Sequence, residues 1–493
     1  MIEPNPGFLV PLAGAVLLMI GISWWVAMRT RDGEDFLLAG RKLRTPLVMG
    51  TTLATLVGTG SSLGAVGYAY ESGWAGALYG IGGAVGVFAL LWLFADVRDK
   101  GFMTFAEEMS YYYGANRVVK GLVAVLLFLA SVGWLGAHIM GGAIYLSYLT
   151  GMGDDTAKIV IALGFGIYTI IGGYLAVVVT DAIQGTLLFL GFTLLAVLAL
   201  VKVGGPAGLS EGTSAEAAGA LGLDALGPLP AVSLALVIAV GVVAGPSYRQ
   251  RIYAAADVRT VRRSFLLAGL LFAAFSALPA VAGIAASRLA PDLPSPDMAF
   301  PYLATELFPA FVGAFLLIAG LSATMSSGDS DAIVGVSILI RDVAQLVTGR
   351  VPRADRVVLY SRLGLGAVLG LALVFALAAE TIIEYITTMI ATILTGLLVA
   401  SLLGKFWRRA TWPGGIAAMV CGSAAALVVN SSGPLTEFWG NAVIPSLAAA
   451  LVAGVVVSLV TPRNRVSSEE ALRVLREERA HLETADALRA REG

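Results

Sequence analysis

Charged residues are scarce in this 493-residue chain, at 13% of the total, whereas a soluble domain carries about a quarter. Cysteine is almost absent: Cys421 is the only one, which excludes a disulfide framework within the chain and a thiolate metal cluster. His138 and His481 are the only histidines, so a histidine-rich metal centre is excluded as well. The net charge of −1 gives no indication of a nucleic-acid partner.

Hydrophobic residues, in contrast, make up 58% of the chain, and the mean hydropathy is +0.85. They are distributed over runs of the length that crosses the hydrocarbon core of a bilayer, about 20 residues each. The first run has no basic segment before it and no cleavage site after it, so we expect a retained helix. Thirteen membrane-spanning helices are predicted, at 8–28, 46–70, 75–96, 118–148, 157–177, 181–201, 230–248, 264–286, 307–340, 360–379, 383–404, 412–430 and 440–461.

Lysine and arginine are concentrated in alternate loops between these runs. The basic loops lie within 29–44, 98–120, 249–263, 341–362 and 405–409, and the acidic or neutral ones within 154–155, 211–224, 292–306, 380–384 and around Glu437. Cytoplasmic loops carry the excess of Lys and Arg. We therefore predict a multi-pass protein of the cell (inner) membrane, with the N-terminus outside and the C-terminus in the cytoplasm.

Two predicted spans contain helix breakers. Residues 54–64 have glycines at 58, 60 and 64 with hydroxyl side chains between them, and residues 245–251 begin with Gly-Pro. Broken helices at corresponding places in two halves indicate a transporter site. If the helices are counted from the second span, each break lies in the first helix of a group of five. Because five is an odd number, the second group crosses the membrane in the opposite direction to the first. The predicted units are 1–45 (an extra helix and a cytoplasmic loop), 46–203 and 204–409 (two inverted repeats), 410–461 (two further helices) and 462–493 (a polar cytoplasmic tail).

The ninth span carries hydroxyl groups and acids at mid-helix. Ala323, Ser326, Ser327 and Ser330 fall at i, i+3, i+4 and i+7, on one helix face, with Asp329 and Asp331 among them. One serine could serve helix packing, but a hydroxyl face with two acids favours a cavity or a ligand. The break at 54–64 is expected at a similar depth. Carbonyls freed at a break and serine hydroxyls are hard oxygen ligands that suit an alkali cation.

Short motifs along the chain match one known family in order and spacing. They are Phe36 to Arg41, Ala54 to Gly67, Tyr70 to Gly73, Thr180 to Gln184, Gly320 to Ser330, Ile340 to Asp342 and Leu403 to Arg409. With these motifs the sequence resembles the sodium:solute symporters, which include sodium/proline, sodium/pantothenate, sodium/sialic acid and sodium/glucose carriers. The resemblance implies an all-α integral membrane protein with a LeuT-like fold: ten core helices in two inverted repeats, one helix before them and two after.

The resemblance also implies ion sites. Sodium would bind the carbonyls of Ala54, Val57 and Ala323 and the hydroxyls of Ser326 and Ser327. A second cation would lie between Asp181, Asp329 and Ser330. The alternative, equally open, is that Asp181 caps its helix and Asp329 faces water. Two departures from the family stand out: proline carriers have an acid where this chain has Leu56, and the third core helix lacks the arginine that sialic acid carriers use.

The solute cavity is expected beside the two breaks. It would be lined near Thr59, Ser61, Ser62, Trp134, His138, Ser247 and Gln250, and also near Thr388. His138 would bind a carboxylate or hydroxyl of the solute, or make a structural hydrogen bond. Because no Lys or Arg is clearly placed at mid-membrane, a multiply charged anion is disfavoured. A small neutral, zwitterionic or monocarboxylate solute remains.

These features predict a sodium-coupled secondary active symporter that imports a small organic solute, such as an amino acid or a monocarboxylate, by alternating access, and that works as a monomer. A proton-coupled carrier of the same fold is the alternative. A carrier-like sensor is less favoured, because the tail after Val460 is too short for an output module. An enzyme is disfavoured, because the sequence shows no nucleophile–base pair, metal cluster or nucleotide loop. In the tail, Ser467 and Glu470 have capping-box spacing, and Leu472, Leu475, Leu482 and Leu488 form a sparse apolar stripe. A solvated amphipathic helix is favoured over a docking helix.

Overall fold

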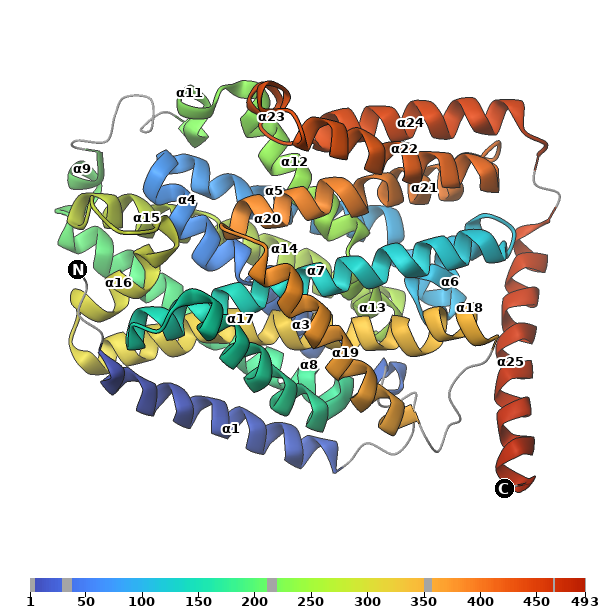
Figure 1. The fold of residues 1–493 in the computed structure, drawn as a ribbon, viewed down its shortest axis with the longest axis horizontal. Coiled ribbons are helices and arrows are strands. Elements are labelled where there is room, and N and C mark those ends of the chain that lie inside the picture. Colours follow the sequence, from blue (N-terminus) through green and yellow to red (C-terminus); the bar gives the residue numbers. More distant parts are fainter. Residues whose placement is uncertain (1–4, 29–37, 211–219, 350–356, 464–465, 493) are drawn as a thin grey trace.

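The computed structural model describes residues 5–28, 38–210, 220–349, 357–463 and 466–492. Within these residues the chain is helical, and its only β-type pairing is a single bridge between Leu43 and Ala255. The principal helices (Figure 1) are α1 (Leu9–Ala27), α3 (Thr45–Leu56), α4 (Ala65–Ser72), α5 (Ala77–Phe94), α6 (Phe105–Tyr112), α7 (Arg117–Thr150), α8 (Asp154–Lys202), α12 (Pro228–Ala244), α13 (Pro246–Ala254), α14 (Val258–Phe275), α15 (Ala277–Leu289), α16 (Ala299–Glu306), α17 (Ala310–Ile338), α19 (Val357–Leu377), α20 (Ile382–Met389), α21 (Thr395–Phe406), α22 (Trp412–Asn430), α24 (Val443–Val460) and α25 (Ser468–Glu492).

The predicted spans correspond to helices of the structure. Ten helices of the described chain are long and apolar enough to cross a membrane, and the bent pair α12 and α13 makes an eleventh. The two other predicted spans are less regular. Run 46–70 is divided between α3 and α4, and run 157–177 is the first part of α8. The chain bends within α8 at Gly173, which has a positive φ of 65°, a conformation that favours glycine.

The break in the second span arises from its glycine and hydroxyl pattern. Helix α3 stops at Leu56, because Val57 leaves the helical region with φ −87° and ψ 58°. The chain resumes as a π-helical turn, Gly60–Gly64, before α4. The Ser61 hydroxyl donates to the Leu56 carbonyl and the Ser62 hydroxyl to the Gly58 carbonyl, both at 2.6 Å. The Ser61 side chain therefore supplies a donor to the last carbonyl of α3, while the Gly58 carbonyl also accepts from the backbone N–H of Ser62 at 3.1 Å.

The second predicted break is also present. Gly245 adopts an extended conformation, Pro246 opens α13, and the axes of α12 and α13 differ by 42°. Proline fits the first turn of the new helix because it has no N–H to donate. One expectation about this region is wrong: Arg249 and Arg251 were assigned to a cytoplasmic loop, but both lie on α13 and are completely buried.

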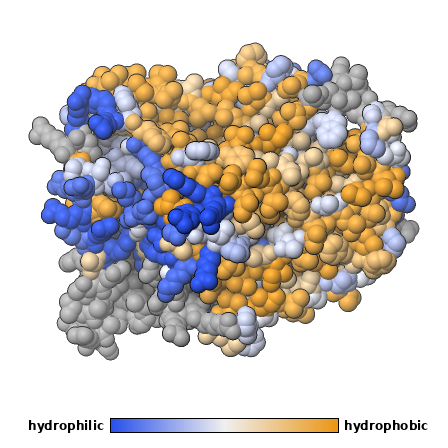
Figure 2. Space-filling view, turned by 180° about the vertical axis from the view of Figure 1, so that it is seen from behind, coloured by the Kyte–Doolittle hydropathy of each residue, from blue (hydrophilic) through white to orange (hydrophobic). Residues whose placement is uncertain are grey.

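Helix α17 is central to the packing. It lies against α3, α7 and α8, and so brings the hydroxyl face to the break after α3. Helices α22 and α24 pack on each other along one side, and α25 stands at one end of the molecule (Figure 1). Figure 2 shows a broad hydrophobic surface over much of the molecule, with hydrophilic residues concentrated towards one end. Such a surface is what a membrane-embedded protein presents to lipid.

Candidate functional site

Four of the five predicted sodium ligands converge between α3 and α17. The hydroxyl oxygens of Ser326 and Ser327 each lie 3.3 Å from the Ala54 carbonyl oxygen. The Ser326 hydroxyl is also 3.4 Å from the carbonyl of Ala323. All four residues are buried. The fifth predicted ligand, Val57, is also buried and directly follows the last residue of α3.

The spacing of these oxygens matches that of ion ligands. Hydroxyl-to-carbonyl hydrogen bonds are usually about 2.7–2.8 Å long, so contacts of 3.3–3.4 Å are weak hydrogen bonds. Oxygen ligands of Ca²⁺, an ion of similar radius to Na⁺, lie at about 2.3–2.6 Å, so ligands at right angles are about 3.3–3.7 Å apart. The separations between these oxygens thus fall in the range found between adjacent ligands of one such ion; that sodium binds here stays a prediction.

A small closed cavity lies on the other side of the same break. Its volume is about 30 Å³, room for only a few water molecules. Four predicted solute residues line it: Thr59, Trp134, His138 and Ser247. Three do not, because the Ser61 and Ser62 hydroxyls turn to backbone carbonyls and Gln250 is buried elsewhere on α13. Thr388 lines a separate groove.

Several lining residues were not singled out for the cavity. They are Asp331, which the sequence placed only near the hydroxyl face, and the aromatic residues Tyr79, Tyr248 and Phe272. Asp331 follows Ser327 by four residues, so it lies one turn further along the same helix face. That spacing was the available signal for Asp331. The aromatic residues come from apolar runs in which nothing distinguishes a cavity wall from ordinary helix packing.

A chain of polar contacts connects four residues that line this cavity. Thr59 Oγ1 lies 2.9 Å from His138 Nδ1, and His138 Nε2 lies 3.2 Å from Asp331 Oδ2. The Ser247 hydroxyl donates to the other carboxylate oxygen of Asp331. His138 and Asp331 are both buried. This arrangement joins the break after α3 to helices α7, α13 and α17.

Asp181 and Ser330, two of the three residues of the predicted second cation site, lie together. The Ser330 hydroxyl donates to Asp181 Oδ2 at 3.1 Å, and the Thr51 hydroxyl donates to the same atom at 2.6 Å. The alternative interpretation does not agree with the fold: Asp181 lies within α8 rather than at a helix start, and Asp329 is completely buried. Whether a second cation binds stays a prediction.

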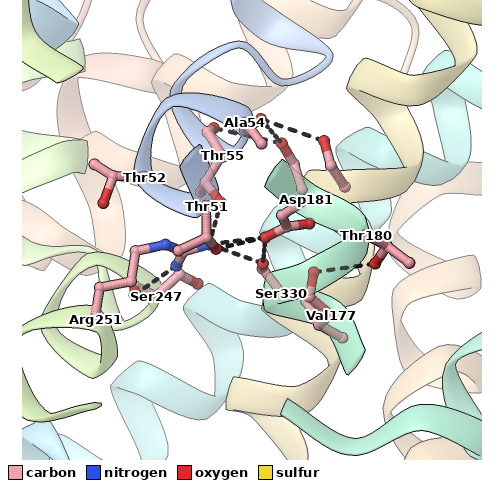
Figure 3. A network of polar contacts seen from close by, with 12 residues as sticks. Thr51, Thr52, Ala54, Thr55, Val177, Thr180, Asp181, Ser247, Arg251 and Ser330 are labelled. Carbon is pink, nitrogen blue, oxygen red and sulfur yellow. Dashed lines mark hydrogen bonds and ion pairs between the residues drawn. The ribbon is translucent and has the colours of Figure 1, made fainter. Parts of the chain in front are cut away.

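The structure shows an arginine within this cluster (Figure 3). Arg251 Nη2 lies 2.9 Å from Thr51 Oγ1, 2.9 Å from Ser330 Oγ and 3.4 Å from Asp181 Oδ2. It also donates to the hydroxyl of Thr55. A guanidinium carries a permanent positive charge, so this one neutralises Asp181 without a bound ion.

A wider opening adjoins the closed cavity along the π-helical turn. Gly60 lines the closed cavity, and Gly64 lines a second cavity of about 460 Å³ that also contains Glu71, Asp297 and Glu384. Between them the turn packs on α20, so closely that a Cβ on Gly60 would meet Ile386 at 2.8 Å. Burial, reinforced by the nearby Glu71 charge and opposed by a backbone hydrogen bond from Ile382, raises the pKa of Asp297 to about 7. The turn that packs on α20 thus contributes residues to both cavities.

The family model for the sodium:solute symporter family matches residues 36–422, most of the chain. The chain belongs to the sodium:solute symporter family. This confirms the resemblance found in the sequence: the protein is a sodium-coupled symporter of a small solute and not an enzyme.

Characterised relatives of this symporter agree with that assignment. It is 25% identical to a sodium/pantothenate symporter of Haemophilus influenzae over 449 residues, with 87% of this chain and 91% of the relative covered. It is likewise 25% identical to the osmoregulated proline transporter OpuE of Bacillus subtilis, with 85% and 87% covered.

Solved structures show the same fold. A Na⁺-coupled sialic acid symporter in a substrate-bound outward-open state superposes with a TM-score of 0.80 at 16% identity, covering 93% of this chain and 98% of that one. The nucleobase-cation symporter Mhp1 in a closed conformation gives a TM-score of 0.60 at 14% identity, with coverages of 90% and 99%. The LeuT-like fold expected from the sequence is therefore confirmed.

Proposed function

We propose that this symporter binds one sodium ion between the carbonyls of Ala54, Val57 and Ala323 and the hydroxyls of Ser326 and Ser327. The observation that carries the proposal is the 3.3–3.4 Å spacing of the serine hydroxyls from the Ala54 and Ala323 carbonyls. The ligands come from the end of α3 and from α17, two helices that pack together but are far apart in the sequence. Sodium would therefore fix the end of α3 against α17 and order the break that follows it.

Sodium and solute would be coupled through that break. Gly58 lies between the two sites: a Cβ placed there would be 2.6 Å from Ser327 Oγ and 3.3 Å from His138 Cε1. An ion that positions residues 54–57 also positions Thr59, which contacts His138 at the cavity. Binding of one ligand then improves the site for the other, as linkage requires of any such coupling.

A single sodium ion per solute is proposed because of Arg251. Its guanidinium contacts side-chain oxygens of Thr51, Asp181 and Ser330. A second cation at this place would need such oxygens as ligands. A second ion at Asp181, Asp329 and Ser330 would bind only if this arginine withdrew. The fixed charge is tethered to α13, the inner part of the broken helix pair, and so cannot be transported.

The solute is proposed to be a small molecule that bears a carboxylate. The carrier is proposed to import it as a monomer, with its own N-terminus outside the cell. The named relatives carry pantothenate or proline, and both of these contain a carboxylate. The alternation of basic and acidic loops supports the orientation. A proton-coupled carrier is the second candidate, because His138 and Asp331 form a buried pair that could exchange a proton.

The sodium site is tested by titrating sodium against transport in the Ser326→Ala/Ser327→Ala double variant. Loss of two ligand hydroxyls should raise the sodium half-saturation about tenfold or more, since a bond to a charged group contributes about 1.5–3 kcal/mol. The wild-type curve should have a Hill coefficient of about one, as for a single ion without coupled sites.

Ser322→Ala is the matched control, because the Ser322 hydroxyl donates within its own helix to the Ile318 carbonyl at 2.7 Å. It lies one turn before Ser326 and should leave the titration unchanged. An unaltered half-saturation in the double variant would show that these serines only pack the helices. A wild-type Hill coefficient near two would refute the single-ion proposal.

A further inference from the structure

Few residues that line the closed cavity can carry charge near neutral pH. Its lining includes Asp331 and His138 but no lysine, arginine or glutamate. Both side chains are buried, and they face each other at 3.2 Å. The lining therefore contains one acid and one base of this kind, and the two lie within pairing distance.

The pair is held in position from several helices. Asp331 comes from α17 and accepts a hydrogen bond from Ser247 of α13, the helix that begins after the Gly-Pro break. His138 comes from α7 and contacts Thr59 in the break after α3. Both broken helices thus contribute a hydroxyl group to the pair. A movement of either break would alter the contact between the acid and the base.

We infer that Asp331 and His138 recognise a zwitterion: the carboxylate of Asp331 binds the ammonium group of the solute, and the imidazolium of His138 binds its carboxylate. The inference rests on the proposed function, because it takes this cavity as the solute site. In the closed cavity the two side chains satisfy each other. The solute would enter between them. The pair between Asp331 and His138 would then be replaced by two pairs, one between each side chain and the solute.

Charge balance selects this class of solute. Removing one partner of a buried ion pair leaves the other charge uncompensated, which is strongly unfavourable. A monocarboxylate inserted between the two would pair with His138 and leave Asp331 without a cation. A simple amine would pair with Asp331 and leave His138 without an anion. A zwitterion satisfies both and adds no net charge to the membrane interior.

The remaining walls define the rest of the solute. Tyr79, Trp134, Ile238, Val242 and Phe272 also line the cavity. These side chains favour an apolar group on the solute, because moving apolar surface from water into an apolar environment is favourable. The structure therefore points to a small amino acid or related zwitterion with an apolar side group.

The test uses the purified full-length chain in detergent and follows its melting temperature. Apolar amino acids are compared with matched compounds that lack one charge, for example L-leucine with 4-methylpentanoate and 3-methylbutylamine, each with and without sodium. At least one zwitterion should raise the melting temperature, and neither of its single-charge analogues should do so. A monocarboxylate that stabilises as well as its zwitterion, or a panel in which no zwitterion stabilises, would overturn the inference.

Two variants assign the roles. Asp331→Asn and His138→Gln should each weaken zwitterion binding by about ten- to a hundredfold, the value of one hydrogen bond to a charged group. Asp331→Asn should in addition shift selectivity towards the monocarboxylate, which a purely structural residue would not do. Asp155→Asn, at an exposed carboxylate at the start of α8, is the control and should bind the zwitterion normally.

Sodium alone separates this inference from the proposed sodium site. Sodium should raise the melting temperature of both variants as it does that of the wild type, because neither side chain is a proposed sodium ligand. That result would also show that the variants are folded. Loss of the sodium effect in the wild type would count against the sodium site, while unchanged zwitterion selectivity in both variants would count against the zwitterion pair.

Discussion

Gly58 separates the proposed sodium ligands from the solute cavity by a single residue. A Cβ at this position would meet both Ser327 and His138, so there is no room for a side chain. The φ/ψ change at Val57 ends the helix just before it. At this position glycine is required by close approach rather than by an unusual backbone angle.

Replacing this glycine should therefore disable both sites together. In Gly58→Ala the new methyl group would lie 2.6 Å from Ser327 Oγ, so the end of α3 or the serine must move. We expect sodium-dependent uptake to fall at least about tenfold, as for loss of one bond to a charged group, in uptake assays normalised to membrane expression. Gly366→Ala on α19 meets no atom within 4 Å and should be neutral. Normal sodium dependence in Gly58→Ala would contradict coupling through this residue.

At the residue scale, the structure brings together four of the five residues predicted to bind sodium and only some of the residues predicted to line the solute cavity. Serines at helical spacing and glycines at mid-span are local patterns, and the structure brings them together. Arg251 was misplaced because its position depends on Pro246 starting a new helix inside the protein. Its partner Asp181 lies 70 residues away along the chain, and no local pattern connects the two.

At the scale of elements, the short helix α6 connects the broken helix to the C-terminal helix. Its Glu108 accepts hydrogen bonds from Arg249 at 2.8 Å and from the hydroxyl of Tyr253, both on α13. The preceding residue, Glu107, pairs with Arg479 of α25 at 2.5 Å. Adjacent acids on one helix thus hold α13 on one side and α25 on the other.

The sequence favoured a solvated tail helix, but residues 468–480 of α25 are docked. Ala471 and Leu475 are buried, and Glu478 accepts a hydrogen bond from Gln345 at 2.7 Å. Leu475 belonged to the apolar stripe recognised in the sequence. Two charged residues, Glu478 and Arg479, also contact the rest of the protein, whereas charges on an amphipathic helix are ordinarily expected to face water. The side chains beyond residue 480, including Leu482 and Leu488, lie outside the described residues.

Removing these two charges should release the helix. In Glu478→Ala/Arg479→Ala we expect the backbone amides of 468–480 to exchange with deuterium about tenfold faster, because partly buried charged hydrogen bonds worth about 1.5–3 kcal/mol are lost. Hydrogen-exchange mass spectrometry measures this directly. Arg473→Ala, whose side chain is exposed and pairs only loosely with Glu477 at 3.8 Å, is the control. Equal protection in the double variant and the wild type would show that apolar packing alone docks the helix.

At the scale of the whole molecule, spans, breaks and order of helices could be read from the sequence, because hydrophobic length and helix breakers are local. Two features could not. The first half of α8 and the second are joined by a bend at Gly173, rather than by the short link expected before residue 181. The packing of α20 against the π-helical turn is a long-range contact, which no local pattern indicates.

The proposed orientation can be tested with single cysteines. In a Cys421→Ser background, Asp155→Cys should react with a membrane-impermeant maleimide in intact cells. Ala256→Cys should react only after permeabilisation, because it lies beside the basic segment 259–263. Both positions are exposed, so the labelling reports on which side of the membrane each residue lies and not whether it is buried. The opposite pattern would place the N-terminus in the cytoplasm. Residue 353, in another basic loop expected inside, lies outside the described residues.

The most direct test of the account is uptake driven by one ion gradient at a time. The purified protein is reconstituted in proteoliposomes, and uptake of the zwitterion that stabilises it best is followed. An inward sodium gradient at equal pH should drive accumulation above equilibrium, and this should be lost in Ser326→Ala/Ser327→Ala. An inward proton gradient without sodium should drive none. Accumulation by the proton gradient alone, undiminished in that double variant, would contradict sodium coupling at the site between α3 and α17.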